Sequence, residues 1–132
     1  MRRLAASWRS GRKWPIRLIA PTLPPYEILN SLYIAVRGKA GRPPRIGEEE
    51  AKEAWEHFCG LRIPLHEVEE VGEDALKLAL RQRWRSVYDL AYVTLAQRRK
   101  AKLISADRGL VETFPEQVLA LGQALGEGAA GK

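Results

Sequence analysis

Hydrophobic positions along the chain recur with two spacings, one typical of short strands and the other of amphipathic helices. Short apolar runs bounded by turn residues predict four strands, at residues 15–21, 61–68, 101–105 and 116–121. Apolar residues three or four positions apart predict four helices, at residues 22–38, 48–58, 73–84 and 87–99. Thr22 and Ser86 are suited to cap the first and the last of these helices.

Helices therefore alternate with short strands over most of the 132 residues. This order predicts an α/β fold with a mainly parallel central sheet, because parallel neighbours need a long connection, usually helical, between them. The length suits a single domain around one hydrophobic core. We expect residues 1–14 to form a basic N-terminal segment and residues 122–132, rich in glycine and alanine, to form a flexible tail.

Charge is unevenly distributed in this chain, whose formal net charge is +6. Six basic residues and no acidic residue precede Glu27, so the whole excess lies in the N-terminal part. Such a segment argues only weakly for a nucleic-acid partner, because a solvated terminus has the same composition. Cys59, the one cysteine, excludes an intrachain disulfide and fits a reducing cytoplasm, and no apolar run is long enough to cross a membrane.

Two of the three aspartates in the chain lie close together in sequence, at positions 89 and 107. Asp89 opens a predicted helix, Asp107 follows a predicted strand, and Glu27 opens the helix after the first predicted strand. In open α/β sheets such positions gather at one edge, where ligands bind. Clustered carboxylates repel one another unless a cation binds, and their hard oxygens suit Mg²⁺ or Mn²⁺. A metal held in this way activates water and stabilises charge on a phosphodiester, which is nuclease chemistry.

A structural explanation of the same acids stays open at this point. Glu27 and Asp89 each lie in the first turn of a predicted helix, where the helix dipole favours a carboxylate without any metal. Asp107 is equally suited to cap a turn.

Two stretches of the chain resemble the acidic motifs of PIN domains, as found in VapC-type toxins. The C-terminal signature of that family is matched by Tyr88-Asp89, Ala91, Ser105-Ala106-Asp107 and Leu110. Its second acidic motif is matched by Ala20-Pro21, Tyr26-Glu27 and Asn30. The resemblance covers about residues 15–121, and the C-terminal stretch is the more specific part.

This resemblance implies a PIN-like three-layer α/β/α domain with the activity of a Mg²⁺- or Mn²⁺-dependent endoribonuclease. It implies that Glu27, Asp89 and Asp107 bind the metal and orient the attacking water. The protein would be the toxin of a toxin–antitoxin pair, with RNA as substrate and a cognate antitoxin as partner. A homodimer and a cytoplasmic location are also implied.

Further polar residues acquire expected roles from the same resemblance. Asn30 and Ser105 would be supporting polar groups, and Arg85 and Arg108 are candidates for contact with the RNA backbone. The rival expectation is a PIN scaffold that binds RNA or protein without cutting. A third, plainer one is an α/β domain whose acids only cap helices and turns.

One departure from the family supports the scaffold. PIN domains begin with a central strand that ends in an aspartate, whereas no acid precedes Glu27 here. Residues 1–21 read instead like the helix after that strand, so we expect a truncated chain or a misassigned start rather than a degenerate gene. Loss of a central strand would expose two strand edges, which the N-terminal segment, a partner or a second copy would have to cover.

Overall fold

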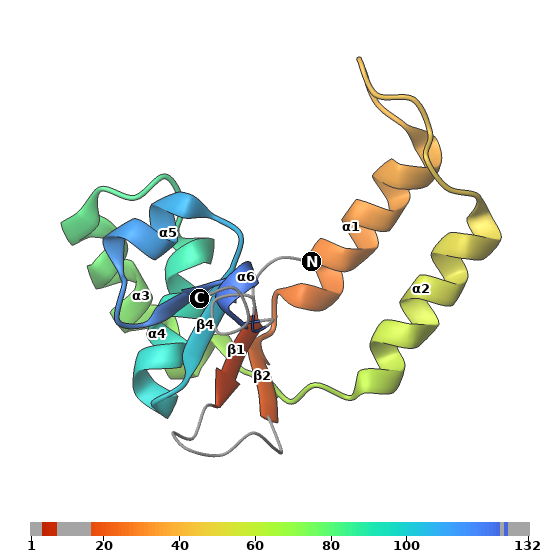
Figure 1. Cartoon of the computed structure of the whole chain (residues 1–132). Helices are drawn as coiled ribbons and strands as arrows, with labels where there is room; N and C mark the ends of the chain where they lie inside the picture. Colours follow the sequence, from red (N-terminus) through yellow and green to blue (C-terminus); the bar gives the residue numbers. More distant parts are fainter. Residues whose placement is uncertain (1–3, 8–16, 125, 127–132) are drawn as a thin grey trace. The chain divides into compact units, whose positions relative to one another are not determined.

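The computed structural model describes residues 4–7, 17–124 and 126. They form two compact units, one made of residues 23–63 and the other of the remaining described residues (Figure 1). The other positions of the predicted N-terminal segment, and residues 125 and 127–132 of the predicted tail, lie outside the described residues.

A five-stranded sheet organises the larger unit. Its strands, in the order β3-β2-β1-β4-β5 across the sheet, are β1 (Leu4–Ser7), β2 (Arg17–Pro21), β3 (Leu65–His66), β4 (Lys102–Ser105) and β5 (Val118–Ala120). The pairs β2–β3 and β4–β5 are parallel, whereas β1 is antiparallel to both β2 and β4. Four strands therefore share one direction, and their carboxyl ends lie at one edge of the sheet.

The central strand β1 is formed by residues that the sequence predicted to be helical, and that prediction is wrong for Leu4–Ser7. In the ladder, Ala5 is opposite both Ile19 of β2 and Leu103 of β4. Without this strand, β2 and β4 would each present a row of unpaired backbone groups. Residues Leu4–Ser7 of the N-terminal segment thus cover the edges of β2 and β4, which is one of the arrangements that we expected. They form an antiparallel strand that contains no acidic residue.

Four helices complete the larger unit. They are α3 (Val68–Gln82), α4 (Val87–Arg99), α5 (Arg108–Thr113) and α6 (Leu121–Ala124). Helix α4 contacts α3 and also β1, β2 and β4, with Leu95 packed in a core that includes Val71 and Ile19 (Figure 1). Among the described residues, no helix is long and apolar enough to span a membrane.

These boundaries correct the prediction in several places. Helix α3 begins five positions earlier than expected, at Val68, and only Leu65–His66 remain of the predicted strand at 61–68. The short helix α5 and the four-residue helix α6 were not predicted. The α/β class and the helix at 87–99 are confirmed.

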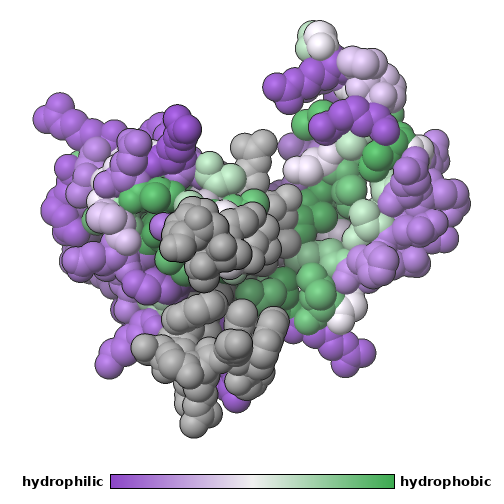
Figure 2. Space-filling view, in the orientation of Figure 1, coloured by the Kyte–Doolittle hydropathy of each residue, from purple (hydrophilic) through white to green (hydrophobic). Residues whose placement is uncertain are grey.

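The smaller unit is a helical hairpin of α1 (Pro24–Arg37) and α2 (Glu48–Leu61). Proline occupies the first turn of α1, as predicted, but the helix starts after Leu23 and Thr22 is not its cap. Hydrophilic residues gather along the outer side of α2, and hydrophobic residues lie toward α1 (Figure 2). A chain reversal at Gly38, whose φ is +77°, ends α1.

Candidate functional site

The turn between α3 and α4 sets the position of the candidate site. Arg83 ends α3 in the left-handed conformation with φ 50°, and the next backbone N–H, of Trp84, donates back to Ala79 O at 3.0 Å. Helix α4 then begins at Val87, after Ser86. Ser86 occupies the N-cap position, as predicted, but its hydroxyl makes no capping hydrogen bond.

Asp89 lies in the first turn of α4 and is only 3% exposed. Helix α4 is covered on most of its faces, so this carboxylate is buried with the core. The indole N–H of Trp84 donates to Asp89 Oδ2 at 2.9 Å, and Arg85 Nη2 lies 3.4 Å from the same oxygen. The carboxylate is therefore held by a neutral donor and a cation from the turn before its own helix.

Asp107 follows the carboxyl end of β4 and caps α5. Its Oδ1 accepts the backbone N–H of Leu110 at 3.3 Å, and its own N–H donates to Ser105 Oγ at 3.0 Å. Its Oδ2 accepts a hydrogen bond from Arg85 Nη2. The capping explanation is thus correct for one oxygen of Asp107, while the other oxygen faces a cation.

A single nitrogen, Nη2 of Arg85, contacts Oδ2 of both aspartates. Both Oδ2 atoms therefore face the same positively charged nitrogen. Carboxylate oxygens are also the donor type that a hard divalent cation prefers. Among the residues that the structure describes, no group of three or more His, Cys, Asp or Glu is placed to hold a metal ion.

Sequence reasoning missed two residues that lie beside the aspartates, Trp84 and Gly109. Trp84 packs against Phe114, with ring centroids 5.9 Å apart, and the Arg85 guanidinium lies 5.2 Å from its ring centroid. A Cβ on Gly109 would lie 3.2 Å from Asp107 Oδ1 and 3.6 Å from the Trp84 ring. The only sequence signal was an indole and a guanidinium directly before an aspartate-bearing helix.

The other predicted site residues fall into two groups. Glu27 lies in the first turn of α1, with Asn30 exposed on the same helix, so both belong to the smaller unit. Ser105 is fully buried and supports Asp107 as described above. Arg108 is exposed and, with Ser105, lines a pocket of about 350 Å³ beside the end of β4.

Basic residues near the end of α4 bind α3. Arg98 pairs with Asp74 at 3.2 Å, and Arg99 donates to both oxygens of Glu70 at 2.9 and 3.0 Å. The Arg99 guanidinium lowers the pKa of Glu70 from 4.5 to about 2. These cations therefore join two helices.

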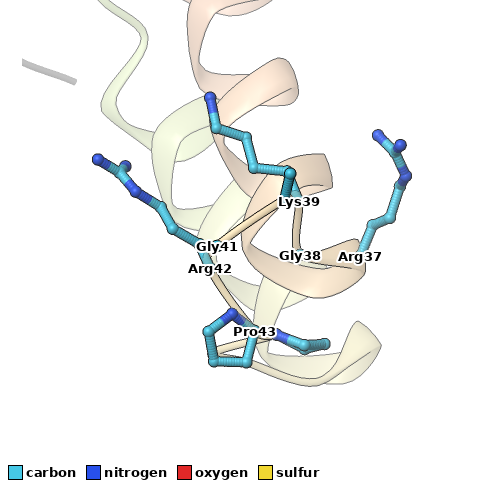
Figure 3. A pocket seen from close by; sticks show the side chains of 8 residues that line it. Arg37, Gly38, Lys39, Gly41, Arg42 and Pro43 are labelled. Carbon is cyan, nitrogen blue, oxygen red and sulfur yellow. The ribbon is translucent and has the colours of Figure 1, made fainter.

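A basic turn connects α1 with α2. Lys39 and Arg42 exchange backbone hydrogen bonds of 2.9 and 2.7 Å, which fixes a tight turn with Gly41 at φ +77°. The side chains of Arg37, Lys39 and Arg42 extend from it in different directions (Figure 3). Residues 37–44 line a shallow pocket that contains no acidic side chain. We call residues 37–45 the basic turn.

Comparison with known proteins gives a relative that covers most of the chain. No family model matches the chain. Ribonuclease VapC3 of Pyrobaculum aerophilum is 40% identical over 97 residues, which make up 70% of this chain and 68% of that protein. This degree of similarity over most of both chains is sufficient to assign a family.

Proposed function

We propose, since the chain belongs to the VapC-type PIN domain family, that it is a metal-dependent endoribonuclease and the toxin of a toxin–antitoxin pair. The observation that carries this proposal is the shared contact of Asp89 and Asp107 with one nitrogen of Arg85. A nuclease centre needs acids that can share a cation, and capping alone would not orient both Oδ2 atoms toward one point.

Mg²⁺ or Mn²⁺ is the proposed cofactor, with Asp89 and Asp107 as its ligands. When bound, such an ion lowers the pKa of a water ligand and stabilises charge on a phosphodiester oxygen. The chain's own groups fix the ligands: the Trp84 indole holds Asp89, and the Leu110 N–H and Ser105 hold Asp107. Their rotamers are therefore set before a metal arrives, which lowers the entropic cost of binding.

Glu27 is the proposed third ligand, supported by chain connectivity. It follows β2 by six positions, and β2 ends at the same sheet edge as β4, which leads to Asp107. Asn30, one turn further along α1, is the proposed polar support for this carboxylate. The three acids and water molecules would complete the coordination of a small divalent ion.

RNA is the proposed substrate, and two basic features support it. The basic turn offers several cations without an acid, which suits a phosphodiester backbone. Arg108 lines the pocket beside Ser105 and is a second candidate for a phosphate contact. The family further suggests a cognate antitoxin, a homodimer and a cytoplasmic location, the last of which fits the single free Cys59.

A second function, a PIN scaffold that binds RNA or protein without cleavage, is favoured because no group of three or more His, Cys, Asp or Glu among the described residues is placed to hold a metal ion. The two functions are separated by incubating the purified chain with end-labelled RNA in Mn²⁺, in Mg²⁺ and in EDTA. The endoribonuclease produces internal cuts only with a divalent ion. RNA binding without cuts under all three conditions would establish the scaffold instead.

A further inference from the structure

Arg85 has an unusual position for a residue expected to contact RNA. One atom, Nη2, contacts both Asp89 Oδ2 and Asp107 Oδ2, and its guanidinium also lies over the Trp84 ring. It therefore supplies positive charge to both carboxylates at once.

The pair needs a counter-charge whether or not a metal is present. Asp89 is almost fully buried, and a buried carboxylate is costly unless it is paired or hydrogen-bonded. The Trp84 indole supplies one hydrogen bond but no charge. Arg85 contributes positive charge to both acids, which stabilises the metal-free site.

The same contact opposes metal binding. A divalent ion held by these two carboxylates would compete with Arg85 for their oxygens, and two cations near the same pair of acids repel one another. Arg85 is able to leave, because its side chain is 60% exposed. When displaced, it can remain stacked on the half-buried Trp84 ring, where cation–π attraction persists.

We propose that Arg85 is the resident counter-ion of the Asp89–Asp107 pair and that a divalent metal must displace it to bind. This inference rests on the proposed function, because it assumes that the two aspartates are metal ligands. Metal affinity is then set by a competition inside the chain: Arg85 stabilises the metal-free protein and weakens metal binding.

The test compares Mn²⁺ binding by calorimetry, and thermal stability in EDTA, for the wild-type chain and Arg85→Met. The variant keeps the length of the side chain but removes its charge. We expect it to bind Mn²⁺ about three- to tenfold more tightly, the range for loss of a partly exposed pair of ion contacts. In EDTA it melts below the wild type, and saturating Mn²⁺ raises its melting temperature by more.

Arg108→Met is the matched control, because Arg108 adjoins Asp107 but forms no ion pair among the described residues. It removes the same charge near the site, and we expect Mn²⁺ affinity within about twofold of the wild type. Arg85→Lys keeps the charge with a single nitrogen and should bind Mn²⁺ with intermediate affinity. This second variant keeps the test decisive if Arg85→Met does not fold.

Three results distinguish the possible failures. Equal or weaker Mn²⁺ binding by Arg85→Met, with binding in both proteins abolished by Asp89→Asn, overturns the competition and leaves the metal site standing. An equal gain in affinity for Arg85→Met and Arg108→Met also overturns it, because the effect would be general charge. An absence of Mn²⁺ binding in every variant overturns the proposed metal site, and the competition with it.

Discussion

The indole of Trp84 provides the sharpest test of how the site is held together. Trp84→Phe retains an aromatic ring against Phe114 but removes the N–H that donates to Asp89 Oδ2 at 2.9 Å. Because Asp89 is 3% exposed, water cannot easily replace the lost donor. The carboxylate would then depend on Arg85 and on its remaining contacts alone.

The expected cost follows from the charge and burial of the acceptor. A hydrogen bond to a charged group contributes about 1.5–3 kcal/mol, and Arg85 on the same oxygen compensates for part of its loss. We therefore expect Trp84→Phe to reduce the free energy of unfolding by about 2 kcal/mol. For a chain of this length, that corresponds to a fall in melting temperature of roughly 6–12 °C.

Urea denaturation in EDTA measures this cost without a contribution from metal. The smaller phenyl ring also loses packing, so the same substitution is made in an Asp89→Leu background, which has no carboxylate to lose. The difference between the two effects isolates the hydrogen bond. Trp55→Phe is the control, since that indole contacts Phe58 and no hydrogen bond to it is found among the described residues.

A coupling below about 0.5 kcal/mol between Trp84 and Asp89 would refute the reasoning, because the measured loss would then be packing alone. If Trp55→Phe lowered the free energy of unfolding as much as Trp84→Phe, the reasoning would also be refuted, because the loss of an indole ring would then explain both effects. Either result would remove Trp84 from the description of the site.

Three further predictions concern other parts of the molecule. Glu70→Gln should lower the free energy of unfolding by about 1 kcal/mol or less at pH 7, since the ion pair with Arg99 is partly exposed. Because folding lowers the pKa of Glu70 from 4.5 to about 2, the wild-type chain loses this contribution as the pH falls through that interval, whereas the variant does not. Gly38→Ala should cost about 1–2 kcal/mol in urea denaturation, since φ is +77° and the new Cβ would lie 2.9 Å from Arg42 O. Replacing Arg37 and Arg42 together by glutamine should reduce the salt dependence of RNA binding, lowering the slope of log K against log salt by about 1.4.

Each of these predictions has a control and a contradicting result. Parallel pH–stability curves between pH 4.5 and 2 would contradict the role of Glu70. Gly60→Ala, where a Cβ meets open space, should not destabilise, and an equal loss at Gly38 and Gly60 would contradict the backbone argument. Lys52→Gln on α2 is the control for the basic turn, because it removes a cation outside that turn. An unchanged slope of log K against log salt in the Arg37 and Arg42 double variant would exclude the basic turn as an RNA contact.

The sequence predicted the α/β class and the aspartate-bearing helix because their signals are strong and local. The helix at 87–99 has apolar residues on most of its faces, and β4 is a short apolar run that ends at a polar cluster. Asp89 lies in the first turn of α4 and Asp107 follows the end of β4, as the sequence predicted.

The features that were missed depend on tertiary pairing. Leu4–Ser7 lie among basic residues and carry no strand pattern, and the open edges of β2 and β4 recruit them. Helix α5 is too short to show a periodicity. Arg85 was predicted to contact RNA, and that contact stays a prediction, whereas its place on two carboxylates follows from the fold and from no sequence spacing.

Cleavage of end-labelled RNA in Mn²⁺ by Asp89→Asn and Asp74→Asn is the most direct test of the central claim. These are two of the three aspartates in the chain, and within the described part of the chain Asp74 forms an exposed pair with Arg98. The proposed site predicts at least a hundredfold loss of rate, about 2.7 kcal/mol, for Asp89→Asn and wild-type activity for Asp74→Asn. Undiminished cleavage by folded Asp89→Asn would contradict the claim that this carboxylate serves a metal-dependent ribonuclease.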